Sequence, residues 1–430
     1  MPIYRGNTKV VSLYRGTTKI VKVYKGTNVV YTSSRLPAEF QEVAYIESTG
    51  TQYIDSGWYS KDTDTVECKF EIINQNALQS GIYGATTTVN SFTLLIRNPI
   101  TARVGQPNQQ ATSQNIQLNT IYNTTLSKSL YKENGIDYTF DGSSSFTLDI
   151  TTLLFARNHT TGAVYRNPIA SKIYSCKIYD NGTLVRDYIP CYRKSDRVIG
   201  LYDTVNDVFY VNAGTGEFKR GPIVDIPNAY QEVEYIESSG TQYIDSGVNA
   251  QSGLTLYSIF QSQNITQTRI VGASTGGYDA VRLALLTSAG DGYLVNQYGT
   301  INNILSSYTL DTNKHSLEND NGTLKYDGIV IDTTTAQTFD IQKSLYVFAS
   351  RSTTILTSYI RIMCCSISNN NVLVRDFIPV YRKSDNVIGL YDLVNGVFYT
   401  NAGTGTFTKG SNIEWELLKM VKQHKRFMKN

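Results

Sequence analysis

One block of sequence occurs twice in this chain of 430 residues, and the duplication limits the folds that the chain can adopt. Residues 41–48 (QEVAYIES) return 190 positions later as residues 231–238 (QEVEYIES), and GTQYIDSG follows in both copies. The similarity resumes where residues 185–190 (VRDYIP) correspond to residues 374–379 (VRDFIP). Solenoid and propeller repeats are about 20 to 50 residues long, so a unit of this length must be a complete domain with its own core.

The limits of the two copies predict the domain organisation. A first domain is expected over residues 36–221 and a second over residues 227–410, with a linker near residues 222–228. An N-terminal segment (1–33) and a C-terminal segment (413–430) lie outside the copies.

Within each copy the local patterns are those of β-strands. Residues 65–72 and 254–260 alternate apolar and polar side chains, as half-buried strands do. The Asp-Gly pairs at 141–142 and 327–328 and the Asn-Gly pair at 181–182 predict tight hairpin turns, because glycine accepts a positive φ. Neither copy has a helical period longer than about ten residues. We therefore predict an all-β fold of two tandem sandwiches.

The composition agrees with a polar β protein. Tyrosine and glycine each occur 32 times and histidine three times, which leaves little material for histidine-based acid-base or metal chemistry. The net charge of +3 gives no reason to expect an obligate nucleic-acid partner. No stretch approaches the roughly 18 apolar residues of a membrane span, and no secretory signal is evident, so cytoplasmic synthesis is expected. Because only Cys176 and Cys365 correspond between the copies, the five cysteines are expected to be reduced and mostly buried.

The repeated motifs resemble the concanavalin A-like, laminin G-like jelly roll found in proteins of bacterial viruses and prophages. The resemblance rests on QEVxYIES, GTQYID, the Asp-Gly hairpins, VRD[YF]IP and NAGTG, and residues 154–158 (LFARN) also resemble a late strand of that family. It implies two tandem jelly-roll domains of a bacteriophage virion protein, assembled in the bacterial host cytoplasm and displayed on the virion surface. It also implies a homo-oligomer, often a trimer in such appendages.

Three short repeats precede the first copy. A Tyr-basic-Gly motif recurs every ten residues at 4–6, 14–16 and 24–26, and each is followed by a polar pair and apolar residues. This spacing predicts strand, tight turn and strand in each repeat. Two interpretations stay open: a small meander packed on the first jelly roll, or an anchor whose strand edges pair with another virion subunit.

The C-terminal segment departs from the β pattern. Residues 413–430 place apolar side chains on one face of a helix and basic side chains on the other, which predicts a short amphipathic basic helix. Since so short a helix is marginal alone, it should dock on its own chain, self-associate, or bind an acidic surface or nucleic acid inside a particle.

No catalytic constellation is evident in either copy. Jelly-roll glucanases carry two carboxylates on one face of a strand, whereas Glu42 and Glu47 are five residues apart and are expected on opposite faces. His159 and His315 have no counterpart in the other copy. We expect no enzymatic activity, no catalytic residue and no organic cofactor.

Calcium is the one metal that the resemblance leaves open. The family often holds calcium at the sandwich rim through oxygen ligands, so Asp55 and Asp245 are the candidate ligands. Capping of the turn before the following glycine would explain the same residues.

The copies differ most in features that suit ligand recognition. Trp58 and Tyr59 stand where the second copy has residues 248–249 (VN), and Tyr278 and Tyr293 lie in stretches peculiar to the second copy. Sugar rings stack on exposed aromatic faces, so these four aromatic residues are the predicted glycan-binding residues. Each could instead be a core or strand-pair aromatic residue.

Taken together, these features predict a non-enzymatic virion structural protein, such as an appendage, fibre or decoration protein. Its lectin-like jelly rolls would attach to a host-surface glycan, and its N-terminal repeats would bind other virion subunits. The alternatives are a purely structural capsid or tail component without a ligand, and an enzyme that degrades cell-envelope polysaccharide.

Overall fold

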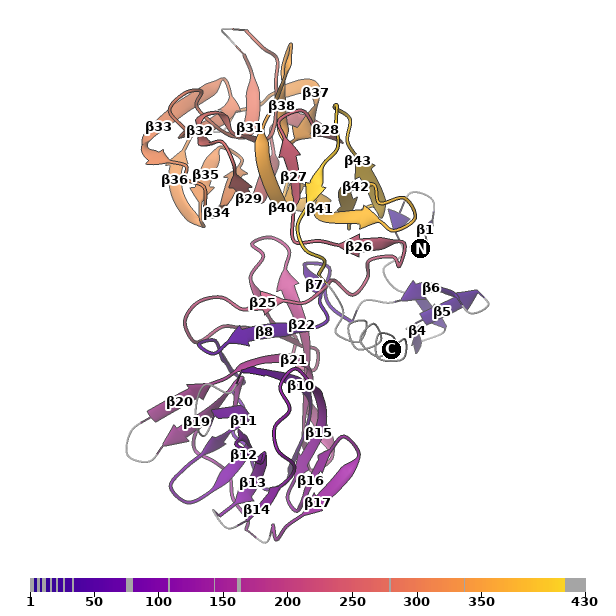
Figure 1. Cartoon of the computed structure of the whole chain (residues 1–430), viewed down its shortest axis with the longest axis vertical. Helices are drawn as coiled ribbons and strands as arrows, with labels where there is room; N and C mark the ends of the chain where they lie inside the picture. Colours follow the sequence, from indigo (N-terminus) through magenta and orange to yellow (C-terminus); the bar gives the residue numbers. More distant parts are fainter. Residues whose placement is uncertain are drawn as a thin grey trace, which may run out of the picture. The chain divides into compact units, whose positions relative to one another are not determined.

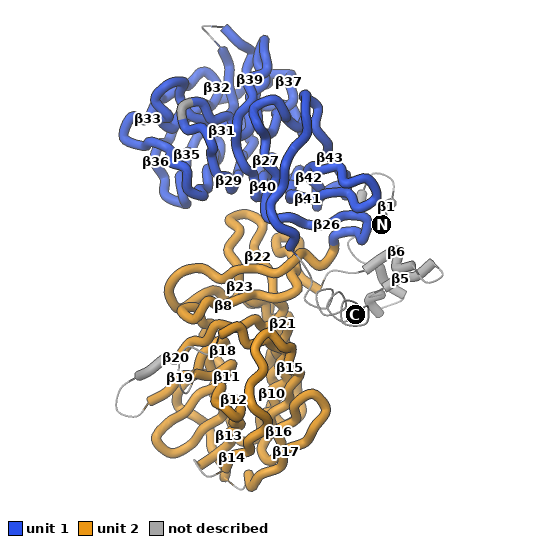
Figure 2. Tube along the Cα trace, viewed as in Figure 1, with its two compact units in different colours: residues 1–9, 226–414 blue, residues 10–225, 415–430 orange. Residues whose placement is uncertain are grey.

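The computed structural model describes residues 35–413 except 75–79, 107–108, 143, 161–163, 278–279 and 336, together with short strands between Tyr4 and Thr32 (Figure 1). The chain divides into two compact units, one containing residues 10–225 and the other residues 226–414 (Figure 2). We call their β-structures the first and the second sandwich. The helix predicted for residues 413–430 lies almost entirely outside the described residues.

Three hairpins occupy the N-terminal segment, as the Tyr-basic-Gly spacing predicts. They form three separate two-stranded antiparallel sheets, and the described strands do not join into a continuous meander. The pairs are β1 (Tyr4–Arg5) with β2 (Thr8–Lys9), β3 (Leu13–Arg15) with β4 (Thr18–Ile20), and β5 (Lys22–Lys25) with β6 (Asn28–Thr32).

The first sandwich consists of an eleven-stranded and an eight-stranded sheet. The larger sheet contains β7 (Phe40–Glu42), β8 (Ile46–Thr49), β10 (Asp64–Asn74), β15 (Ile121–Ser127), β16 (Leu130–Glu133), β17 (Ile136–Thr139), β21 (Ala170–Asp180), β22 (Thr183–Arg193), β23 (Ile199–Asp203), β24 (Val208–Val211) and β25 (Lys219–Arg220). The smaller sheet contains β9 (Ile54–Asp55), β11 (Ser80–Thr86), β12 (Ser91–Ile96), β13 (Thr101–Gly105), β14 (Gln110–Thr112), β18 (Leu153–Leu154), β19 (Ala156–Thr160) and β20 (Val164–Pro168).

The second sandwich repeats this arrangement. Its larger sheet contains β26 (Tyr230–Glu232), β27 (Ile236–Ser239), β29 (Leu254–Ser262), β34 (Lys314–Asp320), β35 (Thr323–Tyr326), β36 (Ile329–Thr333), β40 (Tyr359–Asn369), β41 (Val372–Arg382), β42 (Ile388–Asp392), β43 (Val397–Thr400) and β44 (Thr408–Lys409). Its smaller sheet contains β28 (Ile244–Gln251), β30 (Arg269–Ser274), β31 (Arg282–Thr287), β32 (Tyr293–Gly299), β33 (Ile301–Thr309), β37 (Asp340–Val347), β38 (Ala349–Arg351) and β39 (Ile355–Thr357). A single 3₁₀ turn, η1 (Ile265–Gln267), is the one helical element among the described residues.

The central strands keep the same register in both sandwiches. Order β17-β16-β15-β10-β21-β22-β23-β24 in the first corresponds to β36-β35-β34-β29-β40-β41-β42-β43 in the second. Cys68 of β10 lies opposite Cys176 of β21, and the corresponding pair in the second sandwich is Ser258 and Cys365. All five cysteines are buried and belong to no disulfide, which agrees with the prediction of buried, reduced thiols. The fold is therefore two tandem all-β jelly-roll sandwiches, as the sequence predicts.

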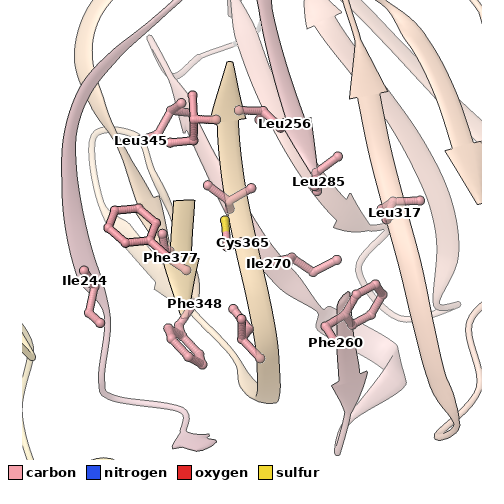
Figure 3. Close-up of a cluster of buried hydrophobic side chains, with 14 of the residues drawn as sticks. Ile244, Leu256, Phe260, Ile270, Leu285, Leu317, Leu345, Phe348, Cys365 and Phe377 are labelled. Carbon is pink, nitrogen blue, oxygen red and sulfur yellow. The ribbon is translucent and has the colours of Figure 1, made fainter. Parts of the chain in front are cut away.

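Each sandwich encloses its own hydrophobic core between the two sheets. The core of the second sandwich includes Ile244, Leu256, Phe260, Ile270, Leu285, Leu317, Leu345, Phe348, Cys365 and Phe377 (Figure 3). Phe155 and Phe348 hold the same place in the two sandwiches and both have positive φ, 64° and 68°. This backbone conformation destabilises the folded state by about 1–3 kcal/mol for a residue with a large side chain. Complete burial of both rings offsets that strain.

Two of the three predicted Gly hairpins are confirmed and one is wrong. Asn181-Gly182 joins β21 to β22, and Asp327-Gly328 joins β35 to β36, with positive φ at all four residues. In the first sandwich the turn that corresponds to 327–328 is 134–135 (NG), which joins β16 to β17. Asp141-Gly142 instead follows the end of β17. Gly142 is required there because a Cβ would overlap the carbonyl of Lys128.

One titratable group in the second sandwich links its fold to pH. His315 of β34 lies between two carboxylates, with Nδ1 2.8 Å from Asp327 Oδ2 and Nε2 2.8 Å from Asp311 Oδ1. Burial opposes protonation of the ring, but the hydrogen bonds to the two carboxylates outweigh it and raise the pKa of His315 above its ordinary value of 6.5. The protonated ring is therefore favoured more in the folded than in the unfolded chain.

We predict that this contact stabilises the second sandwich fully below a pH of about 6.5 and that the stabilisation is lost as pH rises through the folded-state pKa. Urea denaturation of the wild type and of His315→Gln between about pH 5.5 and 9 should converge at the alkaline end. His159→Gln is the control. Burial lowers the pKa of His159, so its effect on stability should change with pH in the opposite direction. Parallel profiles for the wild type and His315→Gln would contradict the prediction.

Candidate functional site

A turn of identical construction occurs in both sandwiches and presents one side chain at the sandwich edge. Asp55 Oδ1 accepts a hydrogen bond from the Gly57 N–H at 3.0 Å, and Asp245 Oδ1 accepts one from Gly247 N–H at 2.9 Å. The two glycines have φ of 63° and 67°, which an L side chain rarely adopts. The expectation that the aspartates cap this turn is confirmed. Their binding of calcium stays a prediction.

The next residue differs between the copies although its backbone is held in the same way. Ser56 Oγ accepts the Trp58 N–H at 3.1 Å, and Ser246 Oγ accepts the Val248 N–H at 3.2 Å. The turn therefore places the indole of Trp58 at the edge of the first sandwich and the isopropyl group of Val248 at the edge of the second.

In the first sandwich the indole of Trp58 is fully engaged by its own chain. Its Nε1–H donates to Asp64 Oδ2 at 2.8 Å. Lys61 Nζ lies 5.0 Å from the ring centroid and the Arg186 guanidinium 5.3 Å from it, both within cation–π range. Trp58 is half-buried, and both cations lie against its ring.

Charged groups complete the filled site. Lys61 Nζ forms an ion pair with Asp180 Oδ2 at 2.5 Å, and Thr63 Oγ1 donates to Asp180 Oδ1 at 2.7 Å. Asp64 is buried, and this desolvation raises its pKa to about 6 even though the Trp58 N–H stabilises the carboxylate. The ring and the charged groups contact one another and fill the site, although the buried Asp64 Oδ1 and Arg186 Nε have no hydrogen-bond partner among the described residues.

The corresponding place in the second sandwich is a cleft of about 270 Å³. It lies between β28 of the smaller sheet and the ends of β29, β40 and β41 of the larger sheet. Its lining residues are Gly247, Val248, Asn249, Gln251, Leu254, Asn369 and Val374. They correspond one by one to Gly57, Trp58, Tyr59, Lys61, Asp64, Asp180 and Val185, because Leu254 pairs with Asn369 as Asp64 pairs with Asp180.

Three charged residues of the filled site are replaced by uncharged residues in the cleft, whereas Arg186 is kept as Arg375. Gln251 stands for Lys61, Leu254 for Asp64 and Asn369 for Asp180. The side chains of Asn249 and Gln251 form no hydrogen bond with the described residues. Asn369 Oδ1 is shielded from solvent and has no hydrogen-bond partner among them. An unsatisfied buried acceptor costs about 1–3 kcal/mol.

A conserved pair of charges supports the site from beneath in both sandwiches. Arg375 Nε donates to Ser246 O at 2.9 Å and lies 3.7 Å from Asp392 Oδ2, which is fully buried. Arg186 and Asp203 repeat the pair at 3.5 Å. The arginine of the second sandwich thus ties β41 to the capped turn and holds the cleft in shape.

The four predicted aromatic residues are divided between the two sandwiches. Tyr59 is exposed beside Trp58, Tyr293 is half-buried in β32 of the second sandwich, and Tyr278 lies outside the described residues. Their binding of glycan stays a prediction. The amides of the cleft were missed because the prediction considered aromatic residues alone. The sequence does show that the second copy has uncharged residues where the first copy has Lys61, Asp64 and Asp180.

A second hollow, of about 320 Å³, lies on the outer face of β10, β15, β16 and β21. Its charged groups are largely compensated, since Lys132 pairs with Asp137 at 3.2 Å and Lys177 lies 3.7 Å from Asp187. It therefore offers less unsatisfied hydrogen-bonding capacity than the cleft.

The carboxylates considered for catalysis are placed differently from the prediction. Glu42 lies on β7 and Glu47 on β8, so they belong to separate strands and not to opposite faces of one strand. Glu42 pairs with Arg35 at 3.0 Å, and Glu47 lies 3.8 Å from Lys219. Among the described residues, no group of three or more His, Cys, Asp or Glu side chains is arranged to hold a metal ion.

Comparison with known proteins gives distant structural neighbours. No protein-family model matches the chain, and no curated protein matches it. Among solved structures, domains LG4-5 of the mouse laminin α1 chain are 13% identical with a TM-score of 0.26, covering 87% of this chain and 94% of that chain. The LG1-3 region of the laminin α2 chain is 12% identical with a TM-score of 0.26, covering 86% of this chain and 66% of that chain. The described part of the chain contains no helix long and apolar enough to cross a membrane.

Replacing Trp58 by the valine of the second copy tests whether the indole is a structural plug. We predict that Trp58→Val lowers the free energy of unfolding of the first sandwich by roughly 2 kcal/mol, less than for a fully buried indole because Trp58 is half-buried. Tyr59→Val, a neighbouring exposed aromatic change, should cost less than about 0.5 kcal/mol. Urea denaturation measures both, and equal costs would show that Trp58 is not held as described.

Proposed function

We propose that this chain is a non-enzymatic carbohydrate-binding protein whose second sandwich holds a neutral sugar unit in the cleft beside Val248. The observation that supports the proposal most strongly is the contrast between the copies. One backbone frame presents an edge site filled by Trp58 and its charged neighbours in the first sandwich and an open, amide-lined cleft in the second.

The chemistry of the cleft suits a polyhydroxylated, uncharged ligand. Amide side chains both donate and accept hydrogen bonds, as pairs of sugar hydroxyls require, and Asn249, Gln251 and Asn369 provide three of them. Val248, Leu254 and Val374 give an apolar wall against which the C–H face of a sugar ring would pack. Ligand pockets for drug-sized molecules start near 300 Å³, so a cleft of about 270 Å³ suits a single ring or chain end.

We further propose that the setting is the surface of a bacteriophage particle. The jelly-roll motifs of both copies resemble those of virion proteins, and the three N-terminal hairpins present short strand edges that would pair with other virion subunits. In this arrangement the hairpins anchor the chain and the second sandwich contacts a glycan of the host surface. Calcium is not required by the proposed contacts.

The structural alternative applies best to the first sandwich. Its edge site is filled by Trp58, which donates a hydrogen bond to Asp64, and by the ion pair of Lys61 with Asp180. We propose that the first sandwich serves mainly as a spacer between the anchor and the second sandwich.

Introducing the plug into the open cleft tests the proposed function. Val248→Trp should reduce binding of the full chain to its best ligand on a host-glycan array at least tenfold, because the indole occupies the sugar position. Val397→Trp, an exposed position of β43 outside the cleft, should leave binding unchanged.

Two results would reject the proposal. Equal binding by the wild type and Val248→Trp would place any glycan site elsewhere, and absence of binding to every host polysaccharide would favour the purely structural alternative. Release of reducing ends from host envelope by the wild type would identify an enzyme instead.

A further inference from the structure

The smaller sheet of the second sandwich ends in a long, uncharged edge strand. β33 (Ile301–Thr309) is nine residues long and, among the described residues, is bonded within the sheet to β32 alone. An edge strand directs the N–H and C=O of alternate residues away from its neighbour, where they can pair with another strand. Its sequence, INNILSSYT, contains no charged residue and no proline, two devices that prevent such pairing. A bulge at residues 306–308 interrupts the pairing with β32, so the regular part of the edge is Ile301–Leu305.

This edge is specific to the second copy. The corresponding strand of the first sandwich, β14 (Gln110–Thr112), is three residues long. Arg103 of the neighbouring strand lies beside it and donates to Gln110 Oε1 at 2.7 Å. At the other end of the smaller sheet of the second sandwich, β28 carries Asp245. The first sandwich forms with a strand of only three residues at this position. The greater length of β33 is therefore not required by the fold.

The edges of both sheets meet at this end of the second sandwich. Asn303 Nδ2 of β33 donates to Asp332 Oδ2 of β36 at 3.1 Å, and Asn296 Nδ2 donates to the same oxygen at 2.9 Å. The Asp332 carboxylate beside β33 thus accepts hydrogen bonds from two amides.

Exposed apolar side chains gather on these two strands. Ile329 and Val330 of β36 are 68% and 54% exposed, and Ile304 of β33 is 56% exposed. They are three of the four most exposed large apolar side chains among the described residues of this unit; the fourth is Val372, at 66%. An exposed apolar side chain on a free strand edge, such as Ile304, is typical of a protein interaction surface.

We infer that β33 pairs antiparallel with β33 of a second copy of this chain, about a two-fold axis near Ile304. A strand without charge meets its own copy without like-charge repulsion, and a two-fold contact requires such a self-complementary surface. The axis brings the two Ile304 side chains together and joins the two smaller sheets into one. A partner strand that carries Lys or Asp would find no opposite charge on β33 and would therefore bind it less favourably. The inference is independent of the proposed glycan site.

Analytical ultracentrifugation of the full chain tests the inference. The wild type should sediment as a species with two copies, and Ile304→Lys should raise the dissociation constant at least tenfold by placing a charge on each side of the axis. Val372→Lys introduces the same change at an equally exposed position of β41 and should leave the mass unchanged. Circular dichroism confirms that each variant is folded.

A crosslinking variant gives a second, independent readout. All five native cysteines are buried, so Ile304→Cys supplies the exposed thiol and should form a disulfide-linked dimer on mild oxidation. A wild type that is monomeric up to about 100 µM, an oligomer that Ile304→Lys leaves intact, or an Ile304→Cys chain that does not crosslink would each overturn the inference.

Discussion

The capped turn at Asp55–Gly57 and Asp245–Gly247 is the constraint on which the functional contrast between the two sandwiches depends. An aspartate carboxylate holds the glycine N–H, the glycine takes a left-handed conformation, and a serine hydroxyl receives the next N–H. Because these contacts involve backbone groups, they place residue 58 or 248 in the same way whatever its side chain. The edge of the sandwich can therefore change its chemistry without any change in its frame.

The two copies use this freedom in opposite directions. In the first, an aromatic ring and two ion-paired side chains satisfy one another, and the buried Asp64 tolerates its environment through a raised pKa and the Trp58 N–H. In the second, the ring and these charges are absent together, which fits the cost of leaving a buried charge such as Asp64 without its partners. The result is a small cleft whose remaining polar groups are amides with unused hydrogen-bonding capacity.

The sequence predicted the frame well and the site poorly, for physical reasons. Period-two alternation in β10 and β29 and the repeated motifs depend on local patterns, so the sandwiches and the hairpins at 181–182 and 327–328 could be predicted. Asp141-Gly142 misled because a glycine required for close packing has the same sequence signature as a glycine required for a turn. The cleft is formed by residues from β28, β29, β40 and β41. These residues lie close together because of the register of the strands, and strand register cannot be predicted from a single sequence.

The most direct measurement of the central claim is a methyl-resolved NMR titration of the full chain with neutral monosaccharides and short host glycans. If the second sandwich alone carries an open site, then the methyl signals of Val248, Leu254 and Val374 should shift in a saturable manner. The signals of Val185, which corresponds to Val374 in the first sandwich, should stay in place. Shifts confined to the first sandwich, or to neither set of methyl groups, would contradict the account.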